Sequence, residues 1–256
     1  MPFTLSHAAA AGAFKPVLGR DRLPLAALAI GTMSPDFEYF LHLEPLALWG
    51  HSPLGLVIFC LPAGLIVLAA WELVAREPVR HLLGFPDEPA AAAPRASRWW
   101  MRAALAVLLG AMTHVLWDGM THEGEWPASR LPALLRTAVM LRGHPVSWAA
   151  VVDYLSTFIG LGIVLGWLYR EMRRSGAFDV LARSGWRRAL LATLAVVALA
   201  LGLVNAALRG EPATDLPSGE VWVGRLAVGA MLAFSASLFV YSLIRRASRT
   251  RAGSAG

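Results

Sequence analysis

The sequence predicts an all-α, polytopic helical membrane protein with about five full transmembrane helices and a short helical hairpin at the N-terminus. Of the 256 residues, 57% are hydrophobic and 16% are charged, whereas soluble domains are roughly 45–50% apolar and about 25% charged. The mean hydropathy is +0.55. This composition excludes disordered, collagen-like and disulfide-rich secreted chains. We expect residues 1–256 to form a single integral membrane domain.

Five apolar runs are long enough to cross the membrane. At about 1.5 Å per helical residue, roughly 20 residues span the ~30 Å of hydrocarbon in a bilayer. Ser52 and Pro53 supply an N-cap and a first-turn proline to the first run. The runs lie near 52–74, 99–120, 149–169, 187–208 and 221–244.

Two shorter apolar stretches precede these runs. One extends from Leu5 to about Val17 and the other from Leu23 to Met33, with a charged turn between them. Each is short for a full span. Arranged as a hairpin, they place His7 and Asp36 together at its open end.

The basic residues predict the orientation. The net charge is +6, but the cations lie at the ends of apolar runs, so we expect no nucleic-acid partner. The hairpin tip, the 75–102 and 170–188 connections and the C-terminal tail form one predicted face, which the positive-inside rule makes cytoplasmic. That face holds all 23 Lys and Arg except Arg130, Arg136, Arg142, Arg209 and Arg225. We therefore expect a multi-pass protein with a cytoplasmic C-terminus.

Two connecting segments have the composition of unstructured chain. Residues 84–98 are rich in proline and alanine and predict a flexible cytoplasmic linker. Residues 247–256 predict a disordered tail. The single cysteine, Cys60, lies in an apolar run and allows no intrachain disulfide.

Ionisable residues gather at the predicted outer ends of the early helices. Such groups are costly at membrane depth and usually have a role there. His114 and Asp118 stand four residues apart, so on a helix both face one side and can bind one cation. With Asp36 and His51 they give four N/O ligands, which suit zinc, with Mn or Fe as alternatives. The predicted metal ligands are His7, Asp36, His51, His114, Asp118 and His122.

The remaining candidates have less direct roles. His7, with Asp118 as a bridging carboxylate, predicts a second ion. His122 is a further ligand or an acid–base catalyst, and Glu123 is a second catalytic candidate. Each of these residues also has an ordinary structural explanation, such as a helix cap or an interfacial histidine. Asp153 is open to three roles: supporting the cluster, pairing with Arg142 or capping its helix.

Several motifs resemble a known family. Pro2-Phe-Thr-Leu-Ser-His7, Gly31-Thr-Met-Ser-Pro-Asp-Phe-Glu-Tyr-Phe40, His51-Ser-Pro-Leu-Gly55 and Gly110-Ala-Met-Thr-His-Val-Leu-Trp-Asp-Gly-Met-Thr-His122 resemble a family of uncharacterised bacterial membrane proteins, domain of unknown function 4184. The chain is also similar, more distantly, to the LexA-regulated inner-membrane metal-dependent hydrolases. This chain has Leu46-Ala47 and Glu38 where those enzymes have His-Arg and a second Asp.

The order of the histidines and aspartates also resembles zinc-dependent phospholipase C. By that resemblance the six predicted ligands occupy zinc-binding positions. The later His-x-x-x-Glu of that group is missing, since Trp148 follows His144 at that spacing. The resemblance therefore implies one or two ions rather than three. The resemblance to the inner-membrane hydrolases implies a location in the bacterial inner membrane.

These observations predict a membrane-embedded metal-dependent hydrolase that acts on a lipid or envelope ester or phosphoester. The alternative is a non-catalytic membrane protein whose polar cluster binds a structural metal or packs helices. Transport is disfavoured, because transporters place polar groups near the bilayer midplane. Membrane lipid is the expected partner.

Overall fold

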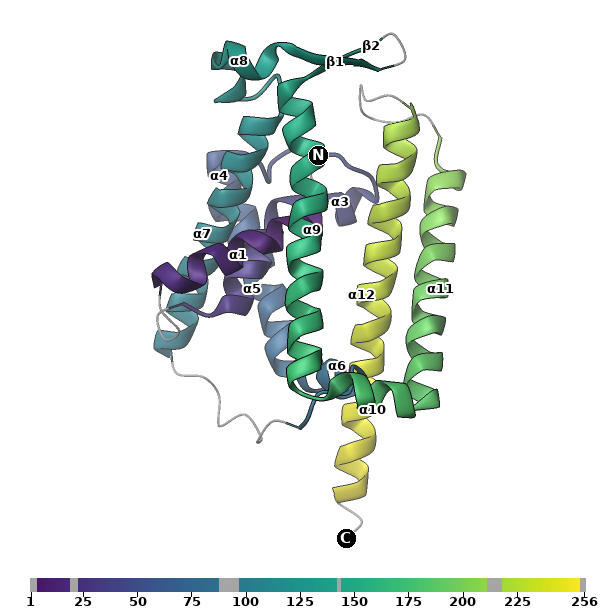
Figure 1. Ribbon diagram of the computed structural model, residues 1–256. Helices are drawn as coiled ribbons and strands as arrows, with labels where there is room; N and C mark the ends of the chain where they lie inside the picture. The colour runs from purple at the N-terminus through teal and green to yellow at the C-terminus, as the bar shows by residue number, and fades with distance from the viewer. Residues whose placement is uncertain (1–3, 19–22, 88–96, 142–143, 211–217, 254–256) are drawn as a thin grey trace. The chain divides into compact units, whose positions relative to one another are not determined.

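Helices form most of the chain (Figure 1). The computed structural model describes residues 4–18, 23–87, 97–141, 144–210 and 218–253. Among these residues, five helical segments are long and apolar enough to cross a membrane: Pro53–Leu82, Ser97–Thr121, Trp148–Arg174, Gly185–Leu208 and Gly219–Arg251. The predicted all-α polytopic fold with about five spans is confirmed.

The surface of these helices is apolar. Ile66, Phe158 and Val196, on three different spans, are 69%, 72% and 67% exposed. In water such large exposed apolar side chains would favour aggregation, whereas in a bilayer they meet lipid tails. The exposure is what a membrane-spanning chain requires.

Contacts divide the chain into two units. The first contains 1–37, 49–66 and 94–168, and the second contains 38–48, 67–93 and 169–256. The single domain expected from the sequence stays a prediction.

The first unit contains the predicted N-terminal hairpin. Its arms are α1 (Thr4–Leu18) and α2 (Leu25–Gly31), followed by a 3₁₀ turn, η1 (Ser34–Asp36). The next helix, α3 (Phe37–His42), belongs to the second unit from Glu38 onward. At 15 residues, α1 is about 22 Å long, too short to cross ~30 Å of hydrocarbon. It runs obliquely across α7 (Ser97–Thr121) in Figure 1. The two arms of the hairpin are therefore too short to cross the membrane.

A pair of proline residues shapes the first long helix. The segment runs through α4 (Pro53–Gly55), a π turn η2 (Leu56–Cys60), α5 (Leu61–Ala70), a second π turn η3 (Trp71–Ala75) and α6 (Arg76–Leu82). Each π turn stands just before a proline, Pro62 or Pro78. A helical proline clashes with the carbonyl four residues earlier and gives it no N–H, and a wider turn relieves both problems.

The backbone carbonyl that Pro78 leaves without a helical N–H accepts a hydrogen bond from another residue. It belongs to Val74, and the Nε of Arg246 donates to it at 2.9 Å. Arg246 lies on α12 (Ser218–Gly253), in the same unit. A cation on the last helix thus satisfies a backbone group that the proline leaves without its usual partner.

A small β-hairpin was not expected from the sequence. It follows η4 (Ala128–Arg130) and α8 (Pro132–Leu135), and consists of β1 (Thr137–Leu141) paired antiparallel with β2 (His144–Ser147). The strands are five and four residues long. Such short stretches give no clear alternating pattern in the sequence. The next helix, α9 (Trp148–Arg174), begins directly after β2.

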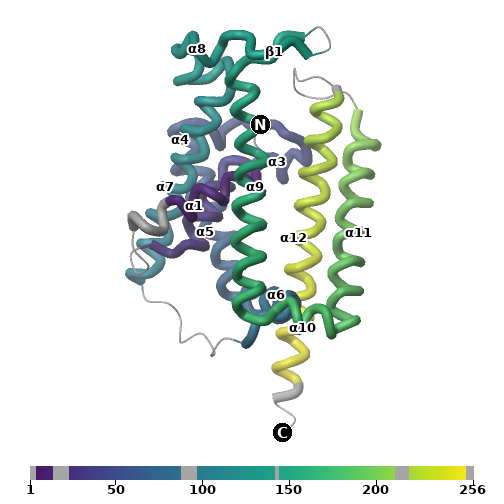
Figure 2. Tube along the Cα trace, viewed as in Figure 1, coloured from purple at the N-terminus to yellow at the C-terminus, as the bar shows by residue number. Residues whose placement is uncertain are grey.

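The second unit is built on α11 (Gly185–Leu208) and α12, which run side by side in opposite directions (Figure 2). A buried ion pair joins Arg225 to Glu44 at 2.7 Å. The Nδ2 of Asn205 donates to the carbonyls of Leu43 and Arg225. These polar contacts fix the 38–48 segment against both helices.

The predicted disordered tail is helical as far as Gly253. Arg249 pairs with Glu77 at 2.6 Å, and the Ser248 and Thr250 hydroxyls donate to carbonyls of the preceding turn. These contacts extend the helix beyond the apolar run, and residues 254–256 lie outside the described part.

The predicted linker is only partly described. Residues 88–96 lie outside the described part of the chain. Phe85, at its start, is buried against Met172 and Ala177. At the other end, Ser97 and Arg98 already belong to α7, while α10 (Ala177–Arg183) packs near Gly84.

Candidate metal centre

Four buried or half-buried side chains converge in the first unit. Asp36, His51, His114 and Asp118 each offer one ligand atom, and these atoms all lie within 4.8 Å of one another. His114 and Asp118 share one face of α7 because they are one helical turn apart. The other two come from segments far away in the sequence.

Local structure places those two residues. Asp36 is the last residue of the 3₁₀ turn η1. Pro35, near the start of this turn, fixes its own backbone φ angle. His51 directly precedes Ser52, whose Oγ caps α4 by accepting from the Gly55 N–H at 2.9 Å. The cap sets the direction in which the chain enters the helix, and so the position of His51.

Five of the six separations among the four ligand atoms are between 3.2 and 3.7 Å. The Nε2 of His51 lies 3.2 Å from Nε2 of His114 and 3.4 Å from Oδ2 of Asp118. It is 3.7 Å from Oδ1 of Asp36. The Nε2 of His114 lies 3.3 Å from that Asp118 oxygen and 3.4 Å from that Asp36 oxygen. Ligands about 2.0–2.1 Å from a tetrahedral zinc are separated by about 3.3–3.4 Å. These five separations are therefore close to those around a tetrahedral zinc.

The tautomer of His114 is set by the backbone. Its Nδ1 lies 2.8 Å from the carbonyl oxygen of Thr32. A carbonyl only accepts, so Nδ1 carries the hydrogen and, in the neutral ring, Nε2 presents a bare lone pair to the centre. Metal-binding histidines in proteins are oriented in this way.

Asp36 has one oxygen held and one free. Thr4 donates its hydroxyl hydrogen to Oδ2 at 2.7 Å. Oδ1, which faces His51 and His114, is buried and has no hydrogen-bond donor. A buried carboxylate oxygen without a donor is costly, and a cation would satisfy it.

His7 adds a second pair of atoms on the other side of Asp118. Its Nε2 lies 3.4 Å from Oδ1 of Asp118, and neither atom has a hydrogen-bond partner. The His7 ring stacks on that of His114, with centroids 3.8 Å apart. Asp118 thus directs one oxygen to His51 and His114 and the other to His7.

Two glycines allow the backbones to approach closely enough for this arrangement. A Cβ on Gly110 of α7 would lie 2.5 Å from the carbonyl oxygen of Leu28 in α2. One on Gly160 of α9 would lie 2.6 Å from the carbonyl oxygen of Ser6, next to His7. The close approach at Gly110 places the Thr32 carbonyl beside His114. The close approach at Gly160 holds the backbone next to His7 against α9.

A family model described as a domain of unknown function (DUF4184) matches residues 1–243. The chain belongs to this family. No curated protein and no solved structure matches it. The description of the family names no activity.

The centre of the DUF4184 protein is nearly closed. The side chains of His114, Asp36 and Asp118 are at most 3% exposed, and that of His7 is 5% exposed. His51, at 14%, is the most accessible. Any small molecule that reaches these ligands approaches on the side of His51.

Burial also sets the protonation of two residues outside the spanning helices. Burial, with the neighbouring His114, lowers the pKa of His7 to about 4. His7 is therefore neutral near pH 7, as a ligand must be. Burial alone would raise the pKa of Asp36, but the adjacent His114 imidazole holds it below its ordinary value.

The two catalytic candidates lie beside the centre and outside the ligand set. The Nδ1 of His122 lies 2.9 Å from the backbone carbonyl of Asp118, at the end of α7. Glu123 is exposed in the following turn. Among the described residues, neither has a side-chain contact with the four-residue cluster.

Other ionisable residues lie elsewhere. His42 and His81 belong to the second unit, and His144 is exposed on β2. Asp153 is buried on α9. Its predicted partner Arg142 lies outside the described residues.

Sequence reasoning did not identify two supporting groups, the Thr4 hydroxyl and the Thr32 carbonyl. Thr4 stands one turn before His7 on α1, and this spacing is the signal that would have placed it near the cluster. A backbone carbonyl leaves no signal in the sequence.

Proposed function

We propose that this DUF4184 protein is a membrane-embedded metal-dependent hydrolase that cleaves an ester or phosphoester of a lipid or envelope molecule. One observation carries the proposal. The two carboxylate oxygens of Asp118 face separate groups of imidazole nitrogens, each about 3.3–3.4 Å away. This arrangement suits a carboxylate that bridges two cations.

The first ion would be held by Asp36, His51, His114 and Asp118. The set of two imidazoles and two carboxylates suits zinc, and it also suits Mn or Fe. Zinc is supported by the separations at His114, which are near those of a tetrahedron of short bonds. Thr4 and the Thr32 carbonyl keep Asp36 and His114 oriented toward this ion.

The second ion would be held by His7 and Asp118. Two protein ligands leave the remaining coordination positions open, which is typical of catalytic rather than structural sites. When bound, a divalent ion acidifies water and polarises a phosphoryl or carbonyl oxygen. The open coordination positions of the second ion are therefore where substrate would bind.

His122 is the residue best placed to move a proton. Its Nδ1 faces the Asp118 carbonyl and so carries a hydrogen, which leaves Nε2 able to accept a proton in the neutral ring. It stands one turn beyond Asp118. Glu123 is exposed, and exposed glutamates more often serve solubility than catalysis, so we rank it second.

The depth of the centre suggests the substrate class. His114 is seven residues before the end of α7, about 10 Å along the helix. This depth corresponds to the region where lipid headgroups join their tails. The proposal includes a bacterial inner membrane location, with the C-terminus cytoplasmic and the centre toward the outer leaflet.

One observation favours a second candidate, a non-catalytic protein with a structural metal. Four protein ligands would complete a tetrahedral shell, and closed four-ligand shells are usual for structural zinc. The two candidates differ at His7. A structural site needs only the first four ligands, whereas the hydrolase needs the second ion.

Metal analysis of detergent-purified protein tests the proposal. After exposure to zinc and removal of excess, wild type should retain two ions per chain, His7→Ala one, and Asp118→Ala at most one. His144→Ala, which removes an exposed histidine, is the matched control. A wild type that retains no zinc, or an Asp118→Ala variant with wild-type content, would contradict the metal centre.

Activity separates the two candidates. The zinc-loaded protein should hydrolyse a nitrophenyl phosphodiester or carboxylic ester, and His7→Ala and His122→Ala should lose this activity while the first ion remains. Zinc-loaded protein that turns over neither ester would favour the structural metal.

A further inference from the structure

A second polar cluster occupies one end of the second unit. It contains His81 on α6, Arg187 in the first turn of α11, and Tyr241 and Arg245 on α12. The Nη2 of Arg187 lies 3.2 Å from Nε2 of His81. Both arginines act electrostatically on His81 and on the Tyr241 hydroxyl. Three helices thus bring these groups together.

Several donors in this cluster are buried without a partner. The Nε atoms of Arg187 and Arg245 and the hydroxyl of Tyr241 have no hydrogen-bond partner. The side chain of Arg245 is 18% exposed. Buried donors left unpaired are costly, and three in one place indicate a common acceptor.

The charge of the cluster is not balanced by its carboxylates. Glu77 lies 3.9 Å from Arg245, but Arg249 binds it at 2.6 Å, so Arg245 has only a share of its charge. Asp87 is 67% exposed and lies 3.7 Å from Nδ1 of His81. Among the described residues, no carboxylate lies within ion-pair distance of Arg187. Arg187 instead contacts Nε2 of His81 and the face of the Trp186 ring.

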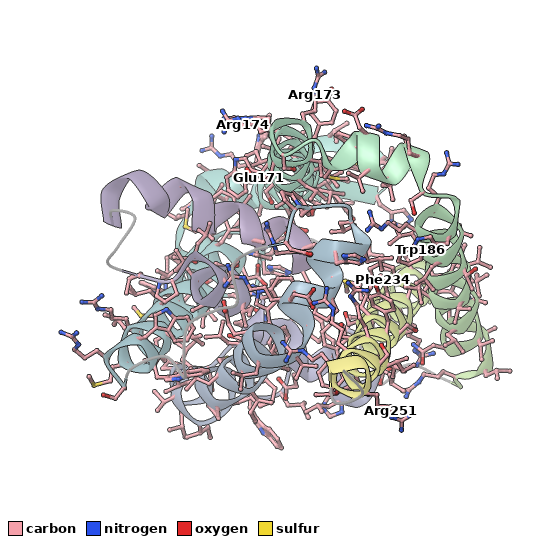
Figure 3. The ribbon with its side chains drawn as sticks, turned by 90° about the horizontal axis from the view of Figure 1, so that it is seen from below. Glu171, Arg173, Arg174, Trp186, Phe234 and Arg251 are labelled. Carbon is pink, nitrogen blue, oxygen red and sulfur yellow. The ribbon has the colours of Figure 1, made fainter. Side chains whose placement is uncertain are left out.

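The position of Arg187 makes an anion more favourable still. A cation in the first turn of a helix opposes the helix dipole, and an anion bound there reverses the penalty. Trp186, beside it, is half-exposed and stacks with His81 at 6.3 Å between ring centroids. Figure 3 views the molecule from this end and labels Trp186. Tryptophan and arginine together are typical of the level of lipid headgroups.

We propose that His81, Arg187, Tyr241 and Arg245 form a binding site for a phosphate group, carried by an anionic phospholipid headgroup or by a free phosphate ester. Arginine guanidinium groups suit phosphate because their N–H donors match its oxygens. The tyrosine hydroxyl supplies a further donor. These residues are separate from the metal ligands, and the site does not depend on the proposed hydrolase.

The test uses the full-length protein in phosphatidylcholine nanodiscs, with thermal unfolding as the readout. One arm adds phosphatidylglycerol to the lipid, and the other adds inorganic phosphate at constant ionic strength. At least one ligand should raise the unfolding temperature of the wild type. The Arg187→Gln/Arg245→Gln variant should bind that ligand about tenfold more weakly.

Matched variants separate the site from general charge. Arg170→Gln/Arg188→Gln removes two exposed cations of the same unit and should behave as wild type. Arg187→Lys keeps the charge but loses the Nε donor, so it should weaken binding if the double variant does not fold. Tyr241→Phe should weaken it in the same way.

The two arms distinguish the source of the phosphate. Stabilisation by phosphatidylglycerol alone identifies a lipid headgroup, and stabilisation by inorganic phosphate identifies a soluble phosphate ester. No stabilisation by either ligand would overturn the proposal. Equal stabilisation of the wild type and the Arg187→Gln/Arg245→Gln variant would also overturn it.

Discussion

Thr4 donates its hydroxyl hydrogen to Oδ2 of Asp36 across 2.7 Å, and both side chains are buried. The bond joins the first turn of α1 to the end of η1. It holds one carboxylate oxygen so that the other faces His51 and His114. The N-terminal hairpin therefore orients a candidate metal ligand that lies just beyond it in the sequence.

Thr4→Val should weaken zinc binding by about tenfold to a hundredfold, the usual cost of losing a partner that orients a ligand. Thr4→Ser, which keeps the hydroxyl, should bind zinc nearly as well as wild type. Competition with a chromophoric chelator measures both affinities. Equal zinc affinity in Thr4→Val and wild type would show that the bond is not needed.

Metal-free protein should lose stability as the pH falls from about 6.5 to about 4. The ordinary pKa of 6.5 applies to His7 in the unfolded chain, and burial lowers it to about 4 in the folded protein. Between these values the unfolded state binds a proton that the folded state does not, so the free energy of unfolding decreases with acidification. The loss is on the order of 3 kcal/mol. His7→Gln should show a flatter profile in denaturant titrations, and an identical profile would contradict the assignment.

Gly110→Ala should destabilise the protein by about 1–3 kcal/mol, because the added Cβ meets the Leu28 carbonyl oxygen at 2.5 Å. It should also reduce zinc binding, since α2 carries Thr32 against His114. Gly166→Ala is the control, because a Cβ there meets nothing within 4 Å. That variant should be as stable as wild type or more so. Denaturant unfolding measures both, and equal effects would argue against tight packing of α2 on α7.

Arg225→Met should destabilise the second unit by about 3–5 kcal/mol, because Glu44 would keep a buried charge without its partner. The double variant Arg225→Met/Glu44→Leu should recover much of this loss. Zinc content should be unchanged in both, since these residues belong to the other unit. A double variant less stable than Arg225→Met would contradict this account.

Reporter fusions test the orientation. A reporter inserted after Leu83 should be cytoplasmic, and one inserted after Gly124 should be on the outer side, because the basic residues favour that arrangement. Fusions that are active only inside or only outside the cytoplasm measure both positions. An outer signal at Leu83 would reverse the orientation and move the metal centre to the inner leaflet.

The sequence predicted those features that depend on local spacing. His114 and Asp118 share a helix face because four residues make about one turn, and the five spans follow from run length. The convergence of Asp36 and His51 on them was expected from the topology, since all lie at the same end of their segments. The structure brings these four together and places His7 beside Asp118.

Features that depend on distant contacts could not be predicted in this way. The helical tail relies on Arg249 and Glu77, which are far apart in the sequence. The hydrogen bond from Arg246 to the Val74 carbonyl could be predicted only if the packing of α12 on the first long helix were already known. The strands β1 and β2 are too short to show an alternating pattern of apolar and polar residues in the sequence. His122 and Glu123 were predicted from proximity in sequence, which does not determine where a side chain points.

The packing of the backbone beside His7 has a consequence for the order in which the protein is assembled. Ser6 is held against Gly160 of α9, the third of the long helices to be synthesised. Before that helix is made, α1 can already bind through Thr4 to Asp36 and through His7 to the ring of His114. The packing around Ser6 and His7 is therefore completed only when α9 has entered the membrane.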